Sequence, residues 1–279
     1  MQNHSILKNN ITSISIGGFD GMHLAHQELF KELDQNGAIV VIETGYANIT
    51  PKTHRSDYTS YPLYYYPLED IKHLNAKEFL SLLKEQYPKL KKIVVGFDFR
   101  FGTKASYGID DLKELFHGEV IVVDEFRKNN TPVHSRSIRE YIANGDIKTA
   151  NIFLDKQYSI IGNHIKGQGL GAKQFVATIN IACEDFLIPQ CGIYATYTII
   201  DNIKYQSVTF IGHRLSTDGK YAIETHILDK NIQNINSKIK IEFIEKIREN
   251  KKFDNFNTLK LQILDDIEKS KVILDNIVT

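Results

Sequence analysis

The sequence predicts two domains of different class: an α/β domain with a parallel sheet, followed by a mostly antiparallel β domain. In the first half, short β-forming runs alternate with helical patterns, which is typical of βαβ units. In the second half, strand-like runs follow one another without helices between them, which favours an antiparallel sheet or a small barrel. The pattern changes after Lys156, so we expect domains at 1–156 and 157–279.

Local patterns predict the elements of the first domain. The expected strands are 11–17, 38–43, 63–66, 92–96 and 119–123. The expected helices are 26–35, 75–87, a short helix before residue 119, 135–144 and 146–154. Asn75 with Glu78 forms an N-cap and capping-box pair, which predicts where the second of these helices begins. The run 92–96 is apolar and typical of a buried parallel strand.

Six short strands are expected in the second domain. They are 158–164, 178–183, 193–200, 205–211, 221–228 and 238–244. Thr258 is expected to cap a final helix, in which four apolar residues share one face: Leu259, Ile263, Ile267 and Leu274. We expect that face to pack against the barrel.

Composition limits the kind of partner. Lys plus Arg and Asp plus Glu both number 34, so no net charge attracts nucleic acid or an anionic membrane, and we expect small-molecule partners. Cys183 and Cys191 lie eight residues apart without a C-x-x-C pair, which argues against a zinc ribbon or a disulfide framework and suits a reducing cytosol. Neither a signal peptide nor an apolar run of about 18 residues is present. We therefore expect a cytoplasmic protein, of an oligomeric state that the sequence does not indicate.

The most site-like stretch is GGFDGMHLAH, residues 17–26, between the first strand and the first helix. Ligands of parallel sheets bind at the carboxyl ends of strands. Glycines let the backbone approach a ligand, a helix N-terminus offers N–H groups to phosphate, and His23 and His26 add donors for developing charge. A glycine turn followed by capping or surface histidines is the alternative. The stretch is neither a P-loop nor a dinucleotide-binding G-x-G-x-x-G, and its H-x-x-H spacing has no evident third metal ligand.

Two further motifs carry charged or hydroxyl side chains. GFDFRFG, residues 96–102, follows a buried-type strand and would present Asp98 or Arg100 to a ligand, or hold an internal salt bridge. VHSRSIR, residues 133–139, gathers hydroxyls and cations at a helix start, which indicates an anion site or simply an N-cap.

In this order and spacing, the three motifs resemble the signatures of the bacterial bifunctional riboflavin kinase/FMN adenylyltransferase (FAD synthetase) family. The third match is partial, because His134 and Arg136 stand where the family has a serine and a threonine. The second half continues the resemblance. Residues 167–181 are similar to the glycine-rich kinase segment that ends in T-x-N, and residues 205–229 are similar to the segment that ends in E-x-H-L-L-D.

The resemblance implies a nucleotidyltransferase-type domain and a six-stranded riboflavin kinase barrel. It implies phosphorylation of riboflavin to FMN in the barrel and adenylation of FMN to FAD in the first domain, with ATP as co-substrate and Mg²⁺ as cofactor. Glu224 would be the catalytic base, and His23 and His26 would stabilise the adenylation transition state. The residues implied to bind ATP are Gly18, Phe19, Asp20, Ser135, Arg139, Gly167, Gly169, Thr178 and Asn180. Thr178 and Asn180 would also bind the metal, and Asp98 and Arg214 the flavin or nucleotide.

Several positions depart from the family pattern. Ala25 replaces a glycine of the first motif, and residues 42–46 replace the usual F-E-P-H-P. Only a loop at 47–62 separates two strands that a helix usually joins, so the flavin side of the adenylation site is altered. In the kinase half, residues 175–177 replace G-F-P.

These departures leave two alternatives to the bifunctional enzyme. One is a riboflavin kinase that retains its first domain as a scaffold. The other is a flavin- or nucleotide-binding regulatory protein without turnover. Both histidines and Glu224 are retained, which counts against the second alternative, because binding alone would not require them.

Overall fold

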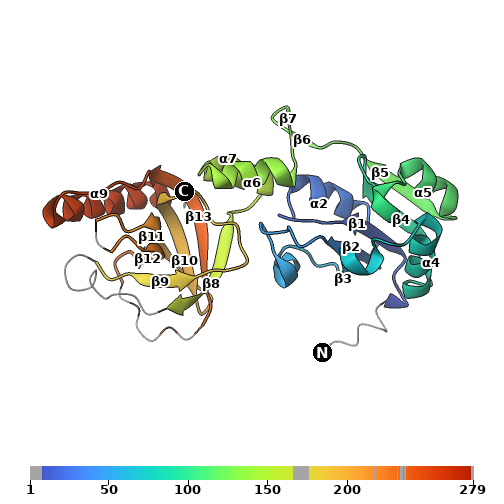
Figure 1. Ribbon diagram of the computed structural model, residues 1–279, viewed down its shortest axis with the longest axis horizontal. Helices are drawn as coiled ribbons and strands as arrows, with labels where there is room; N and C mark the ends of the chain where they lie inside the picture. Colours follow the sequence, from blue (N-terminus) through green and yellow to red (C-terminus); the bar gives the residue numbers. More distant parts are fainter. Residues whose placement is uncertain are drawn as a thin grey trace. The chain divides into compact units, whose positions relative to one another are not determined.

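The computed structural model describes residues 8–165, 176–216, 218–230, 232, 235 and 237–277 (Figure 1). The chain separates into two compact units, Met1–Ser135 and Arg136–Thr279. Helix α7 (Ile147–Leu154) belongs to the second unit, where the Asn151 amide donates a hydrogen bond of 2.9 Å to the Phe243 carbonyl. The functional boundary expected at residue 156 stays a prediction.

The first unit is built on a five-stranded parallel sheet, as the sequence predicts. In spatial order its strands are β3 (Leu63–Pro67), β2 (Gly37–Glu43), β1 (Ser13–Gly17), β4 (Lys92–Gly96) and β5 (Glu119–Val123). Its helices are α2 (Leu24–Lys31), α3 (Leu68–Ile71), α4 (Ala76–Gln86) and α5 (Ile109–Leu115). Two 3-10 helices, η1 (Lys52–Tyr58) and η2 (Thr103–Ala105), and a small hairpin of β6 (Arg127–Lys128) and β7 (Thr131–Pro132) complete the unit.

Alternate residues of the central strands serve two separate cores. On one face of the sheet, Ile14 and Ile93 pack with Leu83 of α4 and other apolar residues. On the other face, Val41 and its neighbours pack with Phe30 of α2. Successive strand side chains point to opposite faces, so helices on both faces are needed to bury a sheet that carries apolar side chains on each face.

Two sequence expectations in this unit have different outcomes. The capping box that opens α4 is confirmed: the Glu78 backbone N–H donates to Asn75 Oδ1 at 3.1 Å, and the Asn75 N–H donates to Glu78 Oε2 at 2.8 Å. The expectation of a plain loop at 47–62 is wrong, because η1 forms within it. A 3-10 helix is too short and too polar to show α-helical periodicity. Arg55 of η1 is buried, and its Nη1 lies 3.6 Å from Glu43 Oε1.

The second unit contains the predicted barrel. Its strands close in the order β10 (Gly192–Ile200), β11 (Ile203–His213), β12 (Tyr221–Ile227), β9 (Ile179–Ala182), β8 (Ser159–Ile165) and β13 (Ile239–Arg248). Every recorded pairing in the barrel is antiparallel. Closure matters because an open sheet of this size would expose unpaired backbone groups at its edges.

Part of the barrel interior is polar. The hydroxyls of one buried group of side chains bond to one another across β10, β11 and β12: Thr196, Thr198, Ser207, Thr209 and Thr225. Each of these residues is fully buried. Hydroxyls inside a barrel are tolerated when they are satisfied by one another, and the network then favours one strand register.

The terminal helix α9 (Phe256–Asp275) packs on the barrel as expected. Ile267 and Leu274 join a core with Tyr197. The predicted cap at Thr258 is wrong: the helix begins after Asn255, whose Oδ1 accepts from the Thr258 backbone N–H at 2.9 Å. Both residue types are good N-caps, and the sequence did not distinguish between them.

Replacing Thr198 with valine tests the hydroxyl network. The Thr198 hydroxyl lies 2.8 Å from both Ser207 Oγ and Thr225 Oγ1, so valine leaves two buried hydroxyls short of a partner. We expect Thr198→Val to lower the free energy of unfolding by about 1–3 kcal/mol in urea denaturation. Thr198→Ser keeps the hydroxyl and loses one methyl, so it should cost about 1 kcal/mol or less. Equal losses in the two variants would contradict a role for the hydrogen bonds.

Candidate active sites

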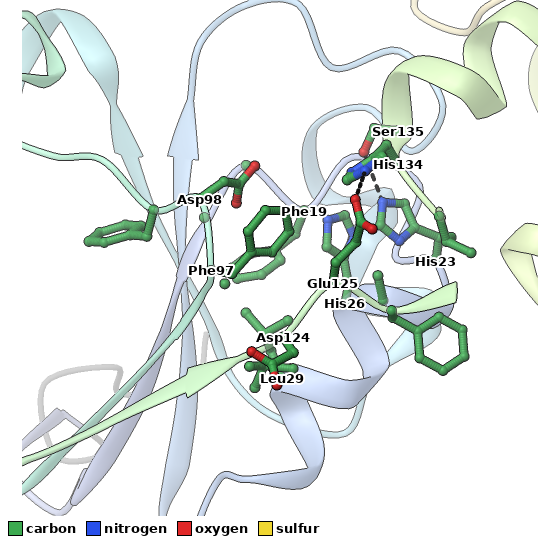
Figure 2. Close-up of a pocket in the computed structure, with 18 of the residues that line it drawn as sticks. Phe19, His23, His26, Leu29, Phe97, Asp98, Asp124, Glu125, His134 and Ser135 are labelled. Atoms are coloured by element: carbon green, nitrogen blue, oxygen red, sulfur yellow. Dashed lines mark hydrogen bonds and ion pairs between the residues drawn. The ribbon is translucent and has the colours of Figure 1, made fainter. Parts of the chain in front are cut away.

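A pocket of about 330 Å³ lies at the carboxyl ends of β1, β4 and β5 in the first unit (Figure 2). The order of strands reverses between β1 and β4, which is where ligands of such sheets bind. All three motifs of the first half contribute to its lining. The residues that follow β1 contribute Gly18, Phe19, His23 and His26, and those that follow β4 contribute Phe97 and Asp98. His134 and Ser135 come from the start of α6 (Ser135–Ala143) and the residue before it.

The loop after β1 has an unusual backbone. Phe19 and Met22 have φ values of 49° and 45°, in the left-handed region that costs a non-glycine residue about 1–2 kcal/mol. Both side chains are buried in the core that α2 covers, and this packing offsets the cost. The loop leaves Gly18 exposed at the pocket, where an added Cβ would meet only the Ile42 carbonyl oxygen at 3.9 Å. A phosphate can therefore approach the Gly18 backbone closely.

Asp20 connects this loop to the segment after β2. Its Oδ1 accepts backbone hydrogen bonds from Ile49 at 3.0 Å and Thr50 at 2.9 Å, and its Oδ2 accepts one from Asn48 at 3.2 Å. In return, the Gly21 N–H donates to Thr50 Oγ1 at 2.8 Å. The carboxylate is buried and faces backbone donors, so Asp20 positions two loops. Its predicted contact with ATP stays a prediction.

The two imidazoles lie together at the start of α2. His23 is the N-cap residue of the helix, and its ring stacks on that of His26 with centroids 3.5 Å apart. His23 Nε2 lies 3.1 Å from Ser135 Oγ, whose proton goes to the Asp20 carbonyl oxygen at 2.8 Å. Because a hydroxyl has one proton to give, Nε2 of His23 must be the donor in the first bond. Ser135 therefore orients His23.

Acidic residues occupy other parts of the pocket. Figure 2 shows Asp98 on the side away from His23 and Ser135, and Asp124 below them, while Glu125 points towards His134. Glu125 Oε1 lies 3.4 Å from His134 Nε2. The hydrogen bond from Arg127 to Glu125 lowers the pKa of that carboxyl, and the bond from His134 acts in the same direction. In the described part of the chain, no hydrogen bond or ion pair joins Asp98 to Arg100, so these two residues do not form the internal salt bridge that was the alternative.

Asp124 and Glu125 were missed by the sequence analysis. Both follow β5, whose position the sequence predicts correctly. Because ligands bind at the carboxyl ends of parallel strands, Asp124 and Glu125 could have been predicted from the sequence. The resulting pocket has the imidazoles and Ser135 on one side, with Glu125 beside His134, and the carboxylate of Asp98 on the side away from them. Such an arrangement suits a molecule that carries both phosphates and hydrogen-bond donors, as a nucleotide does.

A second group of candidate residues lies on the barrel of the second unit. Glu224 of β12 pairs directly with Asn180 of β9 in the antiparallel ladder. The Arg214 guanidinium bonds to both: Nε donates to Glu224 Oε1 at 2.8 Å, and Nη2 donates to Asn180 Oδ1 at 2.9 Å. Asn180 and Glu224, which are 44 positions apart in the chain, are thus brought to one place. Thr178 lies half-buried just before β9.

His226 is a further residue that the sequence analysis did not select. It lies two positions after Glu224 on β12, and its Nδ1 is 2.7 Å from the Ala177 carbonyl oxygen. This contact holds the segment that carries Thr178. Gly167 and Gly169 lie outside the described residues. Arg139 belongs to the second unit, so its predicted contact with the triphosphate also stays a prediction.

Comparisons with known families match both halves of the chain. A family model described as riboflavin kinase matches residues 154–274, and one described as FAD synthetase matches residues 66–137. A bifunctional riboflavin kinase/FMN adenylyltransferase of Buchnera aphidicola is 29% identical over 294 residues, covering 95% of this chain and 94% of its own length. The enzyme of the same name from Listeria monocytogenes is 26% identical, with 92% and 91% covered.

The first unit is a parallel sheet whose switch point gathers imidazoles and a hydroxyl, and the second is a barrel that carries Glu224 and Asn180. Together with the matches to both halves, this defines a two-domain transferase of phosphate-containing groups. The matches to both halves make the class specific. The chain belongs to the bifunctional riboflavin kinase/FMN adenylyltransferase family.

A solved structure from Streptococcus pneumoniae, named a macrolide-efflux protein, has a similar fold. Its TM-score is 0.82 at 25% identity, with 94% of each chain covered. Efflux is said of that protein and is not carried over to this one. Among the residues that the structure describes, no helix has the length and apolar character that crossing a membrane requires.

Replacing Asp20 with alanine tests the connection between the two loops. The change removes the acceptors of three backbone N–H groups, at Asn48, Ile49 and Thr50. We expect amide hydrogen exchange at these positions to accelerate about 10-fold or more, because each bond to a carboxylate contributes about 1.5–3 kcal/mol. Asp20→Asn keeps one carbonyl oxygen and should have a smaller effect. Unchanged exchange in both variants would contradict this role of Asp20.

Proposed function

We propose that this protein makes FAD from riboflavin in two ATP-dependent steps, with a separate site for each step. The barrel of the second unit phosphorylates riboflavin to FMN, and the pocket of the first unit adenylates FMN. The observation that carries the proposal is that both sites keep their chemical groups in one chain: the imidazole pair beside Ser135, and Glu224 beside Asn180. The relatives named for both activities support it.

Adenylation is a displacement at the α-phosphorus of ATP. An oxygen of the FMN phosphate forms the new P–O bond, the bond to the β-phosphate oxygen breaks, and pyrophosphate leaves. His23 and His26 would stabilise the negative charge in the transition state, and the N-terminus of α2 acts in the same direction. Gly18 and Phe19 would contribute backbone contacts, and Arg139 would hold the triphosphate. Asp98 would accept hydrogen bonds from the nucleotide or the flavin.

Riboflavin phosphorylation needs a base for the ribityl 5′-hydroxyl. Glu224 would accept that proton as the hydroxyl oxygen attacks the γ-phosphorus and ADP leaves. Its side chain is 21% exposed, so a substrate hydroxyl can reach it. Its ladder partner Asn180 is buried, and the hydrogen bond from Arg214 Nη2 to Asn180 Oδ1 sets the direction of the amide.

The residues near Glu224 are compatible with magnesium. Mg²⁺ prefers oxygen ligands and is usually bound by one or two protein groups together with substrate phosphates. Thr178 and Asn180 offer a hydroxyl and a carboxamide oxygen of this kind. When bound, the ion would neutralise charge on the phosphates of ATP. Cys183 and Cys191 are both free thiols, which fits our proposal that the protein acts in a reducing cytoplasm.

Incubation of the purified protein with riboflavin, ATP and magnesium, followed by chromatography of the flavins, tests the proposal. FAD is the expected product. FMN without FAD would instead favour a riboflavin kinase whose first domain is a scaffold. Unchanged riboflavin would favour a binding protein without turnover.

Two single substitutions should separate the half-reactions. Glu224→Gln removes the base and should slow FMN formation by about 100-fold or more, while adenylation of added FMN continues at its normal rate. His26→Ala should slow adenylation by about 10-fold or more and leave FMN formation intact. His117→Ala, which changes an exposed imidazole of the same unit outside both the pocket lining and the segment 47–62, is the matched control for the histidine variant. A Glu224→Gln protein that made FMN at the normal rate would refute the assigned base.

A further inference from the structure

Arg214 contacts three side chains from three different segments. Besides Glu224 on β12 and Asn180 on β9, its Nη1 donates to Asp218 Oδ2 at 3.3 Å. Each of the three guanidinium nitrogens therefore has a different acceptor. The Arg214 side chain is 17% exposed, and those of Glu224 and Asp218 are 21% and 19% exposed, so the group is mostly shielded from water.

The backbone around Arg214 fixes the position of this side chain. The Arg214 N–H donates to the Lys220 carbonyl at 3.0 Å, and the Gly219 N–H donates to the Arg214 carbonyl at 3.1 Å, which closes the turn between β11 and β12. Gly219 has a φ of 71°, which favours glycine. The neighbouring His213 carbonyl accepts from the Asn250 amide at 2.8 Å. The backbone at Arg214 is thus held by hydrogen bonds through both its N–H and its carbonyl.

The contact with Glu224 orients the proposed base. Arg214 bonds to Oε1 of the carboxylate, so Oε2 is the oxygen available to a substrate hydroxyl. A guanidinium stays charged at every physiological pH, so its single bond to Oε1 is charge-assisted and restricts the rotation of the carboxylate. A base that is held in this way loses less entropy when the substrate arrives.

The contact with Asn180 has a different consequence. The carboxamide oxygen that accepts from Arg214 Nη2 is the same oxygen that the proposed magnesium site would use. A carbonyl oxygen has two lone pairs, but two cations that approach one oxygen repel each other in a site that is partly shielded from water. The Arg214–Asn180 bond and metal binding therefore compete.

We infer that Arg214 is a positioning residue that couples the base to the metal ligand of the kinase site. It holds Glu224 for proton transfer throughout, and it releases the Asn180 oxygen when magnesium and nucleotide bind. This inference rests on the proposed riboflavin kinase function, because it assigns a role to a residue of that same site.

The test compares Arg214→Ala with the unaltered full-length protein. We expect kcat for FMN formation to fall about 10-fold or more while KM for riboflavin changes by less than about threefold, as for a group that acts on the transition state. Added guanidinium ion at low millimolar concentration should restore part of kcat, and Arg214→Lys should lie between the two proteins. In titration calorimetry with ADP present, magnesium should bind Arg214→Ala several-fold more tightly, because the competing cation is gone.

Arg248 provides a matched control in the same unit. It forms a two-bond pair with Asp266, at 2.8 and 2.6 Å, and neither residue belongs to the proposed site. Arg248→Ala should lower stability without a fall in kcat, without guanidinium rescue and without a change in magnesium affinity. The inference is overturned if Arg214→Ala behaves like this control. If the unaltered protein formed no FMN, the proposed function would be wrong. The magnesium affinities of Arg214→Ala and the unaltered protein would then test the competition at Asn180 independently of activity.

Discussion

The buried carboxylate of Asp20 is the interaction on which the pocket of the first unit depends. The carboxylate accepts hydrogen bonds from three successive backbone N–H groups. The backbone carbonyl oxygen of Asp20 accepts a further hydrogen bond from the Ser135 hydroxyl. An unpaired carboxylate in that position would be costly, so the two loops and the start of α6 are held in one arrangement. The positive φ values of Phe19 and Met22 are offset by the burial of both side chains and by this arrangement of hydrogen bonds around them.

The barrel achieves similar order by different means. Its interior contains a group of hydroxyls that satisfy one another, while its outer side carries Glu224, Asn180 and Arg214, which are mostly shielded from water. Alternation along β12 explains both, because Thr225 points inwards and its neighbour Glu224 does not. A network inside the barrel that favours one register thereby also fixes which residues meet outside it.

The fold accommodates two of the departures from the family pattern, at Ala25 and in the segment after β2. Ala25 lies inside α2 and is not among the residues with positive φ, so its methyl group causes no backbone strain. The segment after β2 contains η1, and its residues 48–50 are bound to Asp20. The segment that was expected to be altered on the flavin side is therefore held by backbone hydrogen bonds, and Arg55 within it is buried. Tyr46, near the start of this segment, is 81% exposed, more than any other large apolar or aromatic side chain among the described residues.

The sequence by itself determined much of this protein, because local patterns report period, caps and breaks. Strands β4 and β5 begin and end where predicted, and the capping box of α4 is present. The three motifs of the first half all reach one pocket. Tertiary structure alone decided the partners of the polar groups. Ser135 and His23 are 112 residues apart, Asn180 and Arg214 are 34 apart, and Asp20 and Thr50 are 30 apart. Hydrogen bonds of this kind depend on how strands and loops approach in space, which no periodicity along the chain records.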